Sequence, residues 1–319
     1  MIPFFPRFPL SPDVAAETGI HIGDGGLSIK RKGPHGSYQY EVTGHALEDQ
    51  LYLIGTVMPT ISAAYGLQRP GFYINPEQTW ISLRYQNKAV ALFKNETLGL
   101  PNGRKRDLSI PALIRRDSHL MKHLARELLA TDGVLGFYNA GACRLHKYPR
   151  IQIKLKACPV IEQLASFLRV ELGIHATCRY NLGIHEGWGT SLQQIIQVNR
   201  SEDIDTWRRE IGFSNPSHIS RMMVFELRGE CSPRTSIVDR LSMLSGRLSR
   251  SGGASEQLRP QELISLITQM RKHFGFPRLE GKEVLHVMTQ INRRLEFKLG
   301  RGLPPIVSLW GRRRDFPTY

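Results

Sequence analysis

The hydrophobic pattern of this chain contains one unit twice: an apolar helix that ends on an acidic turn and leads into a strand. Residues 123–137 carry leucines at helical spacing up to Asp132, and a β-prone run begins directly after the glycine that follows. Residues 17–28 repeat the arrangement around Asp24. A single Asp-Gly pair is commonly only a turn, but two pairs in matching contexts predict a duplicated unit of helix, aspartate and strand.

The position of the two aspartates makes them candidate metal ligands. The C-terminal end of a helix carries partial negative charge from its unpaired carbonyl groups, so a carboxylate is repelled there. A bound cation removes that repulsion. Asp24 and Asp132 are therefore predicted to hold a cation.

The remaining pattern extends the duplication, because each half is predicted to run helix, strands, helix, strands, helix. In the first half, strands are expected at 27–32, 38–43, 72–74 and 79–85, and helices at 47–65 and 88–97. In the second half, helices are expected at 118–131, 159–172 and 202–211, and strands at 134–138, 150–156, 176–180 and 192–198. Pro59 is expected to kink or split the helix at 47–65.

The strand at 150–156 alternates cleanly between apolar and polar residues. One face carries isoleucine and leucine, and the other carries Gln152, Lys154 and Lys156. For a single strand, a lysine-bearing face is as readily explained by solvent exposure. Several such strands in a basic protein favour a sheet that faces DNA.

The overall charge points to a polyanionic partner. Of the 319 residues, 41% are hydrophobic and 22% charged, as in ordinary globular proteins, but the net charge is +15 and the pI about 9.9. Such a balance favours nucleic acid or an anionic membrane. Residues 2–6 are too short and too broken by proline for a signal peptide, and no uninterrupted apolar run is long enough to span a bilayer. Nucleic acid is therefore the favoured partner.

The cysteines indicate the compartment. The four cysteines show no C-x-x-C pairing, which argues against a zinc site or a disulfide framework. A reducing cytoplasm fits this usage. We expect a cytoplasmic, nucleoid-associated protein that is not secreted.

Both acidic-turn stretches resemble the signature helix of the LAGLIDADG homing endonucleases. Residues 99–105 (Gly-Leu-Pro-Asn-Gly-Arg-Lys), the pair Ile110-Pro111, and residues 210–218 look like parts of single-chain, archaeal-type members of that family. The resemblance covers roughly residues 15–223, about two-thirds of the chain.

This resemblance implies an α+β fold of two pseudo-symmetric repeats, at 1–115 and 116–223, that pack through their signature helices. Their antiparallel sheets would form a saddle over the DNA major groove, and the chain would be a monomer with internal pseudo-dimer symmetry. Residues 224–319 lie outside the resemblance, and their pattern predicts a small, basic, mainly helical extension. An amphipathic helix is expected at 237–248 and a linker at 249–255. Two further helices are expected at 260–274 and 281–299, and Arg312-Arg-Arg314 is a basic end. The extension is either a DNA-binding unit of helix-turn-helix type or a cap on the saddle.

The resemblance also implies the site. Asp24 and Asp132, with the residues that precede them, Gly23 and Thr131, would hold Mg²⁺, with Mn²⁺ as the alternative, above the minor groove. Two carboxylates brought this close repel without a cation. Mg²⁺ suits phosphodiester cleavage, because it keeps water and phosphate oxygens among its ligands.

Two further sets of residues complete the expected site. Lys88 and Arg200 follow Asn87 and Asn199 at the junction from the last strand to the last helix of each half, where the family often has a basic residue. A helix cap followed by a solvated cation explains these junctions equally well. The expected DNA-binding residues on the strands are basic or amide side chains: Lys30, Lys32, Arg84, Gln152, Lys154, Lys156 and Arg179.

The chain departs from the family pattern in the second signature helix. The third signature position is usually small, which Gly19 satisfies and Glu127 does not. Ala130 stands where an acidic residue is common. These departures concern helix packing and the efficiency of cleavage, since both aspartates are retained.

Two classes of function remain. The first is a metal-dependent homing endonuclease that makes a double-strand break at a long DNA site. The second is a non-cutting binder on the same fold, either an intron-splicing maturase with intron RNA as a partner or a DNA-binding regulator.

His119 and His123 lack the glutamate and third ligand of a zinc protease motif and are expected to be surface or packing residues. The chain also lacks the terminal residues that an intein needs for splicing.

Overall fold

Two four-stranded antiparallel sheets with the same strand order form the framework of this chain. The computed structural model describes residues 7–31, 36–45, 48–68, 70–75, 80–139, 145–185 and 189–244. The strand orders are β1-β2-β4-β3 and β5-β6-β8-β7. The strands of the first sheet are β1 (Gly25–Lys30), β2 (Ser37–His45), β3 (Gly71–Asn75) and β4 (Trp80–Gln86). Those of the second sheet are β5 (Gly133–Tyr138), β6 (Tyr148–Lys156), β7 (Thr177–His185) and β8 (Gly189–Val198).

The helices follow the same duplication. The first half has α1 (Pro12–Gly23), α2 (Gln50–Tyr52), α3 (Met58–Tyr65) and α4 (Lys88–Leu92), and the second half has α6 (Ser118–Asp132), α7 (Pro159–Val170) and α8 (Ser201–Glu210). The short helix α5 (Ala112–Arg115) connects the two halves. The α+β fold of two matching repeats is therefore confirmed, and the two sheets also share their register. Gly25 pairs with Val42 in the first sheet, as Gly133 pairs with Ile153 in the second.

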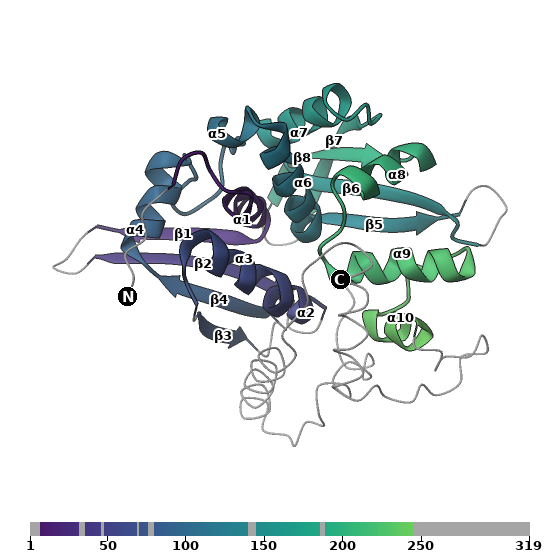
Figure 1. The fold of residues 1–319 in the computed structure, drawn as a ribbon, viewed down its shortest axis with the longest axis horizontal. Coiled ribbons are helices and arrows are strands. Elements are labelled where there is room, and N and C mark those ends of the chain that lie inside the picture. The colour runs from purple at the N-terminus through teal and green to yellow at the C-terminus, as the bar shows by residue number, and fades with distance from the viewer. Residues whose placement is uncertain are drawn as a thin grey trace, which may run out of the picture.

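The helices α1 and α6 lie side by side between the two sheets (Figure 1). Both begin with a side-chain cap. The Ser11 hydroxyl accepts from the Val14 N–H at 3.3 Å, and Pro12 occupies the first turn of α1. The Asp117 carboxylate accepts from the N–H groups of the first turn of α6 at 2.8 and 3.1 Å. Each helix therefore starts at a fixed residue and ends at its aspartate.

Glycine allows these two helices to approach closely. A Cβ atom on Gly19 would lie 2.4 Å from the Leu124 carbonyl oxygen of α6, and one on Gly23 would lie 2.0 Å from the Thr131 hydroxyl. Real Cβ atoms do not approach other atoms so closely, so a side chain at either position would force the helices apart. The spacing of four residues places both glycines on the same face of α1.

The core lies between the sheets and their helices. The inner face of the first sheet contributes buried residues such as Tyr40, Val42, Ile81 and Leu83. In the second sheet the alternation predicted for 150–156 is observed, with Ile151 and Ile153 fully buried. At roughly 1.5–3 kcal/mol for each large apolar side chain, this burial is the main stabilising contribution.

A buried ion pair anchors α1 to the rest of the first repeat. The Glu17 and Lys94 side chains are both 0% exposed, and their charged atoms lie 2.5 Å apart. The Tyr65 hydroxyl also donates to Glu17 at 2.5 Å, and the Lys94 ammonium lies 4.2 Å from the centre of the Tyr40 ring. Burial lowers the pKa of Lys94, and Glu17 opposes that shift. The pair is satisfied within the core, so removing one partner would leave a buried charge.

The helix predicted at 47–65 is interrupted, as Pro59 suggested. It begins as α2, widens into a π-helical turn at Leu53–Val57, and continues as α3 with Pro59 in its first turn. Proline has no N–H to donate to the preceding turn. A second π-helical turn, Phe93–Thr97, follows α4 and completes the helix predicted at 88–97.

Two helices follow the second repeat. The first, α9 (Pro216–Arg228), packs on β5 through stacked rings of Phe137 and Phe225, 4.6 Å apart, and was not predicted as a helix. The second, α10 (Ile237–Leu244), packs on α9. The expected boundary between 223 and 224 falls inside α9. The linker and later helices expected at 249–299, the basic residues at 312–314, and Lys32 lie outside the described residues.

Among the helices that the structure describes, none is both long enough and apolar enough to cross a membrane.

The close approach of α1 and α6 gives a stability prediction. Gly19→Ala should lower the free energy of unfolding by about 1–3 kcal/mol, because the new Cβ atom meets the Leu124 backbone oxygen of α6. Gly26→Ala on β1 is the matched control, since its Cβ atom would lie 3.4 Å from the nearest atom, in Glu41. Urea denaturation of both variants measures the effect. A more stable Gly19→Ala protein, as helix propensity alone predicts, would contradict the packing.

Candidate functional site

The two aspartates predicted to bind metal meet where α1 and α6 end. Asp24 is the residue at the C-terminus of α1, with its N–H bonded to the Ile20 carbonyl at 2.9 Å, and Asp132 is the last residue of α6. The two helix ends are in contact, because a Cβ atom on Gly23 would lie 3.1 Å from the Asp132 carboxylate. The two repeats thus bring together two carboxylates that are far apart in the sequence.

These carboxylates have perturbed protonation. Burial raises the pKa of Asp24 to about 7, and the charges of Asp132 and Asp49 raise it further, against Lys105. Burial raises the pKa of Asp132 to about 6, and Lys105 opposes this shift. The raised pKa values of Asp24 and Asp132 mean that both carboxylates are partly removed from water. Positive charges of the chain compensate their negative charge only in part.

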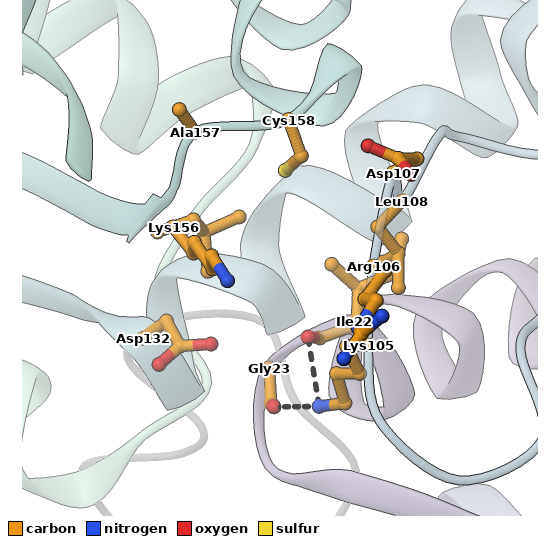
Figure 2. A pocket seen from close by; sticks show the side chains of 11 residues that line it. Ile22, Gly23, Lys105, Arg106, Asp107, Leu108, Asp132, Lys156, Ala157 and Cys158 are labelled. Atoms are coloured by element: carbon orange, nitrogen blue, oxygen red, sulfur yellow. Dashed lines mark hydrogen bonds between the residues drawn. The ribbon is translucent and has the colours of Figure 1, made fainter. Parts of the chain in front are cut away.

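The ammonium group of Lys105 lies at the C-terminal end of α1 and brings a positive charge to the two aspartates. Its ammonium group donates to the carbonyl oxygen of Ile22 at 3.0 Å and to that of Gly23, so it binds the free carbonyl groups at the end of α1 (Figure 2). Burial lowers the pKa of Lys105 to about 8, while Asp132 and Asp24 raise it. We did not assign this lysine from the sequence, although it ends the 99–105 motif.

Lys105 and Asp132 line a cavity of about 270 Å³. Gly23 and the segment Lys105–Leu108 line one side, and Asp132 with the end of β6 lines the other (Figure 2). Lys156, expected to bind DNA, belongs to this lining. The cavity therefore combines the carboxylates of Asp107 and Asp132 with the cations of Lys105, Arg106 and Lys156.

The donor set at the helix ends suits a hard divalent cation. Mg²⁺ and Mn²⁺ prefer oxygen ligands, and the carboxylates of Asp24 and Asp132 supply them. The Gly23 carbonyl oxygen, also expected as a ligand, accepts from the Lys105 ammonium group. In the parts of the chain that the structure describes, no group of three or more His, Cys, Asp and Glu side chains is placed to hold a metal. The two aspartates thus fit a cation that takes its remaining ligands from water and phosphate.

The departure at Glu127 is accommodated at the helix interface. Its carboxylate is 1% exposed and accepts from the Tyr52 hydroxyl at 2.9 Å, the Ser214 hydroxyl at 2.8 Å and the Arg126 guanidinium at 2.9 Å. Three donors, one of them charged, compensate the buried charge. Tyr52 belongs to the first repeat, so Glu127 links the two repeats.

The structure does not bring Lys88 and Arg200 to the aspartates. Lys88 is exposed beside the Tyr38 ring, 5.5 Å from its centre, and Tyr38 pairs with Ile29. Ile29 is four residues beyond the start of β1, which corresponds to about 13 Å of extended strand. Arg200 is exposed in the equivalent place, at the start of α8. We therefore replace these two residues by Lys105 as the cation at the centre.

The polar faces of the sheets carry the other expected residues. On the second sheet Lys154, Lys156 and Arg179 are exposed, and Gln152 is half-buried. Lys154 and Arg179 both pair with Ile195, so they lie in one row across the sheet. Arg150 shares the face of Lys154 on β6, by alternation, and was missed.

The polar face of the first sheet is less basic. Lys30 is exposed at the end of β1. Arg84 forms an ion pair with Glu41 at 3.1 Å and lies 4.2 Å from the centre of the Tyr73 ring. The two faces thus differ in charge although the strands match.

The histidines of α6 lie away from the centre. The rings of His119 and His123 are 4.8 Å apart, and Arg126 lies within hydrogen-bond distance of His123. Burial lowers the pKa of His123 to about 4, and Arg126 and His119 lower it further.

No protein-family model matches the sequence, and no curated protein matches it. Solved structures of LAGLIDADG homing endonucleases are similar to this chain. I-DmoI in complex with its target DNA, nicked in one strand in the presence of manganese, is 18% identical, with a TM-score of 0.43 over 63% of this chain and 96% of that one. The meganuclease I-SmaMI bound to uncleavable DNA is 10% identical, with a TM-score of 0.41 over 76% and 99%. I-GzeII in complex with its DNA target is 8% identical, with a TM-score of 0.42 over 82% and 97%.

The raised pKa of Asp24 predicts how stability depends on pH without metal. A carboxyl group whose pKa rises from 3.8 to about 7 on folding stabilises the protein fully below pH 4, and this contribution is lost as the pH rises through 7. Between pH 5 and 8 the loss should be on the order of 2 kcal/mol. Asp24→Asn should abolish this part of the pH dependence.

The measurement is urea denaturation in a chelator at pH 5 and pH 8. Asp205→Asn is the matched control, because Asp205 is exposed on α8. Identical pH dependence in the wild type and Asp24→Asn would show that Asp24 is not perturbed.

Proposed function

We propose that this chain is a site-specific, divalent-metal-dependent DNA endonuclease. The observation that carries the proposal is the meeting of Asp24 and Asp132 at the ends of two paired helices, beside a cavity that contains Lys105 and Lys156. Two half-buried carboxylates with raised pKa values, which Lys105 compensates only in part, are the arrangement that a metal ion and a phosphate would complete.

The reaction is hydrolysis of a phosphodiester. The oxygen of a water molecule adds to phosphorus, one P–O ester bond breaks, and the released oxygen takes up the proton that the water loses. A divalent ion held by Asp24 and Asp132 would supply positive charge at the attacking and leaving oxygens. Two carboxylates from two equivalent repeats suit a substrate with two antiparallel strands, so the product is a double-strand break.

The residues of the chain itself have distinct roles in this reaction. Lys105 is held at the end of α1 by the carbonyl groups of Ile22 and Gly23, and its charge acts on both carboxylates from there. From there it reduces the repulsion between the aspartates and the phosphate. Lys156 faces the same cavity from β6 and offers a second cation to the phosphate backbone.

The sheets provide the DNA-binding surface in this proposal. Their polar faces carry Lys30, Arg84, Gln152, Lys154 and Arg179, and the net charge of +15 adds long-range attraction. A chain with two internal repeats contacts both half-sites of duplex DNA as a monomer. Mg²⁺ is the proposed ion, with Mn²⁺ as the alternative, and the proposed location is the cytoplasm.

The aspartates provide the test of catalysis. Asp24→Asn and Asp132→Asn should each lower the rate of cutting at least 100-fold, because each removes a ligand from the centre that stabilises developing charge. Binding of the same duplex in Ca²⁺ should stay within a few-fold of wild type or become tighter, because a negative charge near phosphate is removed.

The assay begins with a duplex selected from a randomised library in Ca²⁺, which is then incubated with Mg²⁺ or Mn²⁺. Lys88→Met is the matched control, since the structure places Lys88 far from the aspartates. A wild-type protein that binds the selected site tightly and never cuts it would replace the endonuclease by a non-cutting maturase or regulator.

A further inference from the structure

One row across the outer face of the first sheet carries a pair of opposite charges between two glycines. Glu41 on β2 pairs with Arg84 on β4, and these two strands lie between β1 and β3 (Figure 1). Gly26 on β1 pairs with Glu41, and Gly71 on β3 pairs with Arg84. Both charged residues lie between buried neighbours on their own strands, so their side chains point away from the core. No side chain of β1 or β3 therefore flanks the pair within its row.

Hydrogen bonds hold the Glu41 carboxylate through one of its two oxygens. The Oε2 atom accepts from the Gln39 amide at 3.1 Å, the Ser82 hydroxyl at 3.2 Å and the Arg84 Nε at 3.1 Å. Within the described part of the chain, no hydrogen bond uses the Oε1 atom. The carboxylate is thus fixed in place with one acceptor oxygen available to a ligand.

The Arg84 guanidinium is fixed in the same way. Its Nε donates to Glu41, and its central carbon lies 4.2 Å from the centre of the Tyr73 ring, a position that favours a stacked guanidinium. Among the residues that the structure describes, none hydrogen-bonds to its two terminal nitrogens. The Arg84 and Glu41 side chains are each 35% exposed. The row therefore offers two donors from arginine beside one acceptor from glutamate.

The fold does not require this pair of charges. The matching register of the second sheet places Gln152 and Gln197 where the first sheet has Glu41 and Arg84, and neither glycine is repeated there. The same sheet thus forms with two neutral amides. An ion pair that is partly exposed to water contributes little to stability. A role in binding therefore explains the pair better than a role in folding.

The pair lies close to the proposed centre of the DNA interface. The Thr43 N–H donates to the Asp24 carbonyl oxygen at 3.1 Å, and Glu41 is two residues from Thr43 on β2, or about 7 Å along the strand. A carboxylate on a surface that faces DNA is repelled by the phosphates. It is tolerated where it accepts a hydrogen bond from a base, and in the major groove the amino groups of cytosine and adenine are such donors.

A G·C base pair matches the row in the order of its groups. Across the major groove, guanine presents the N7 and O6 acceptors, and cytosine then presents its N4 amino donor. The row presents the reverse: two donors from Arg84, then one acceptor from Glu41. A T·A pair would place the thymine methyl group against an arginine donor. Of the four base pairs, only G·C with guanine at Arg84 satisfies all three groups.

We propose that Arg84 and Glu41 together read one G·C base pair in the half of the DNA site that the first repeat contacts. Guanine N7 and O6 accept from the terminal nitrogens of Arg84, and the cytosine amino group donates to Glu41 Oε1. This inference rests on the DNA binding in the proposed function, and it is independent of cutting.

The experiment selects duplexes from a randomised library in Ca²⁺ and then compares the dissociation constants of duplexes that differ at one position. The wild type should select G·C at one position near the centre and bind it at least ~10-fold more tightly than the other three pairs there. Arg84→Gln should reduce this preference to less than about threefold, because the bidentate contact with guanine is lost.

Glu41→Ala should act at the same position in a different way. Duplexes with another base pair there should bind more tightly, because a carboxylate without a donor is removed. The preference for G·C should therefore fall at least ~5-fold while affinity for the G·C duplex changes less. A role in folding alone would not tighten binding to the other duplexes.

Arg31→Gln is the matched control. It also removes one arginine from an exposed ion pair of the first repeat, since Arg31 bonds to Glu96 at 2.8 Å. It should leave the selected sequence unchanged, and any loss of affinity should be equal for all duplexes.

The outcomes separate this inference from the endonuclease. A wild type that selects no G·C pair near the centre overturns the inference, as does an Arg84→Gln protein that binds all duplexes more weakly with the same preference. Changes at two different positions in Arg84→Gln and Glu41→Ala also overturn it. The predicted preference in a protein that never cuts DNA supports this inference and overturns only the endonuclease.

Discussion

The close contact between α1 and α6 is the constraint on which the rest of the structure depends. Gly19 and Gly23 remove the side chains that would separate the helices, and the Glu127 carboxylate links them through Tyr52 and Ser214. The same contact forces Asp24 and Asp132 together at the helix ends, where burial and mutual repulsion raise the pKa of Asp24. The packing that stabilises the fold thus creates the unfavourable charge that a metal ion would relieve.

Around this contact the two repeats keep one topology and differ in chemistry. Their strand orders and registers match, yet the first repeat buries the Glu17–Lys94 pair where the second has apolar residues such as Ala125. The polar face of the first sheet carries an ion-paired Arg84, and that of the second sheet carries exposed lysines such as Lys154. A repeated backbone therefore places the two aspartates in equivalent positions, while the side chains around them differ between the repeats.

The sequence was sufficient to predict the two repeats, because strand alternation and the Asp-Gly turns are local signals. Ile151, Ile153 and the aspartates lie where the pattern placed them. Lys105 was missed because its role depends on a loop that returns to α1, which no local spacing reveals. Lys88 and Arg200 were misplaced because antiparallel pairing carries the ends of β4 and β8 away from the aspartates. The start of α9 at Asn215 and Pro216 carries ordinary capping signals that we read only as part of a motif.

The most direct test of the central claim is anomalous X-ray scattering from crystals of the protein bound to a selected duplex in Mn²⁺. The account predicts manganese within about 2.2 Å of carboxylate oxygens of Asp24 and Asp132, with a DNA phosphate oxygen in the same coordination shell. Manganese bound elsewhere, for example at His119 and His123, with both aspartates free of metal, would contradict it.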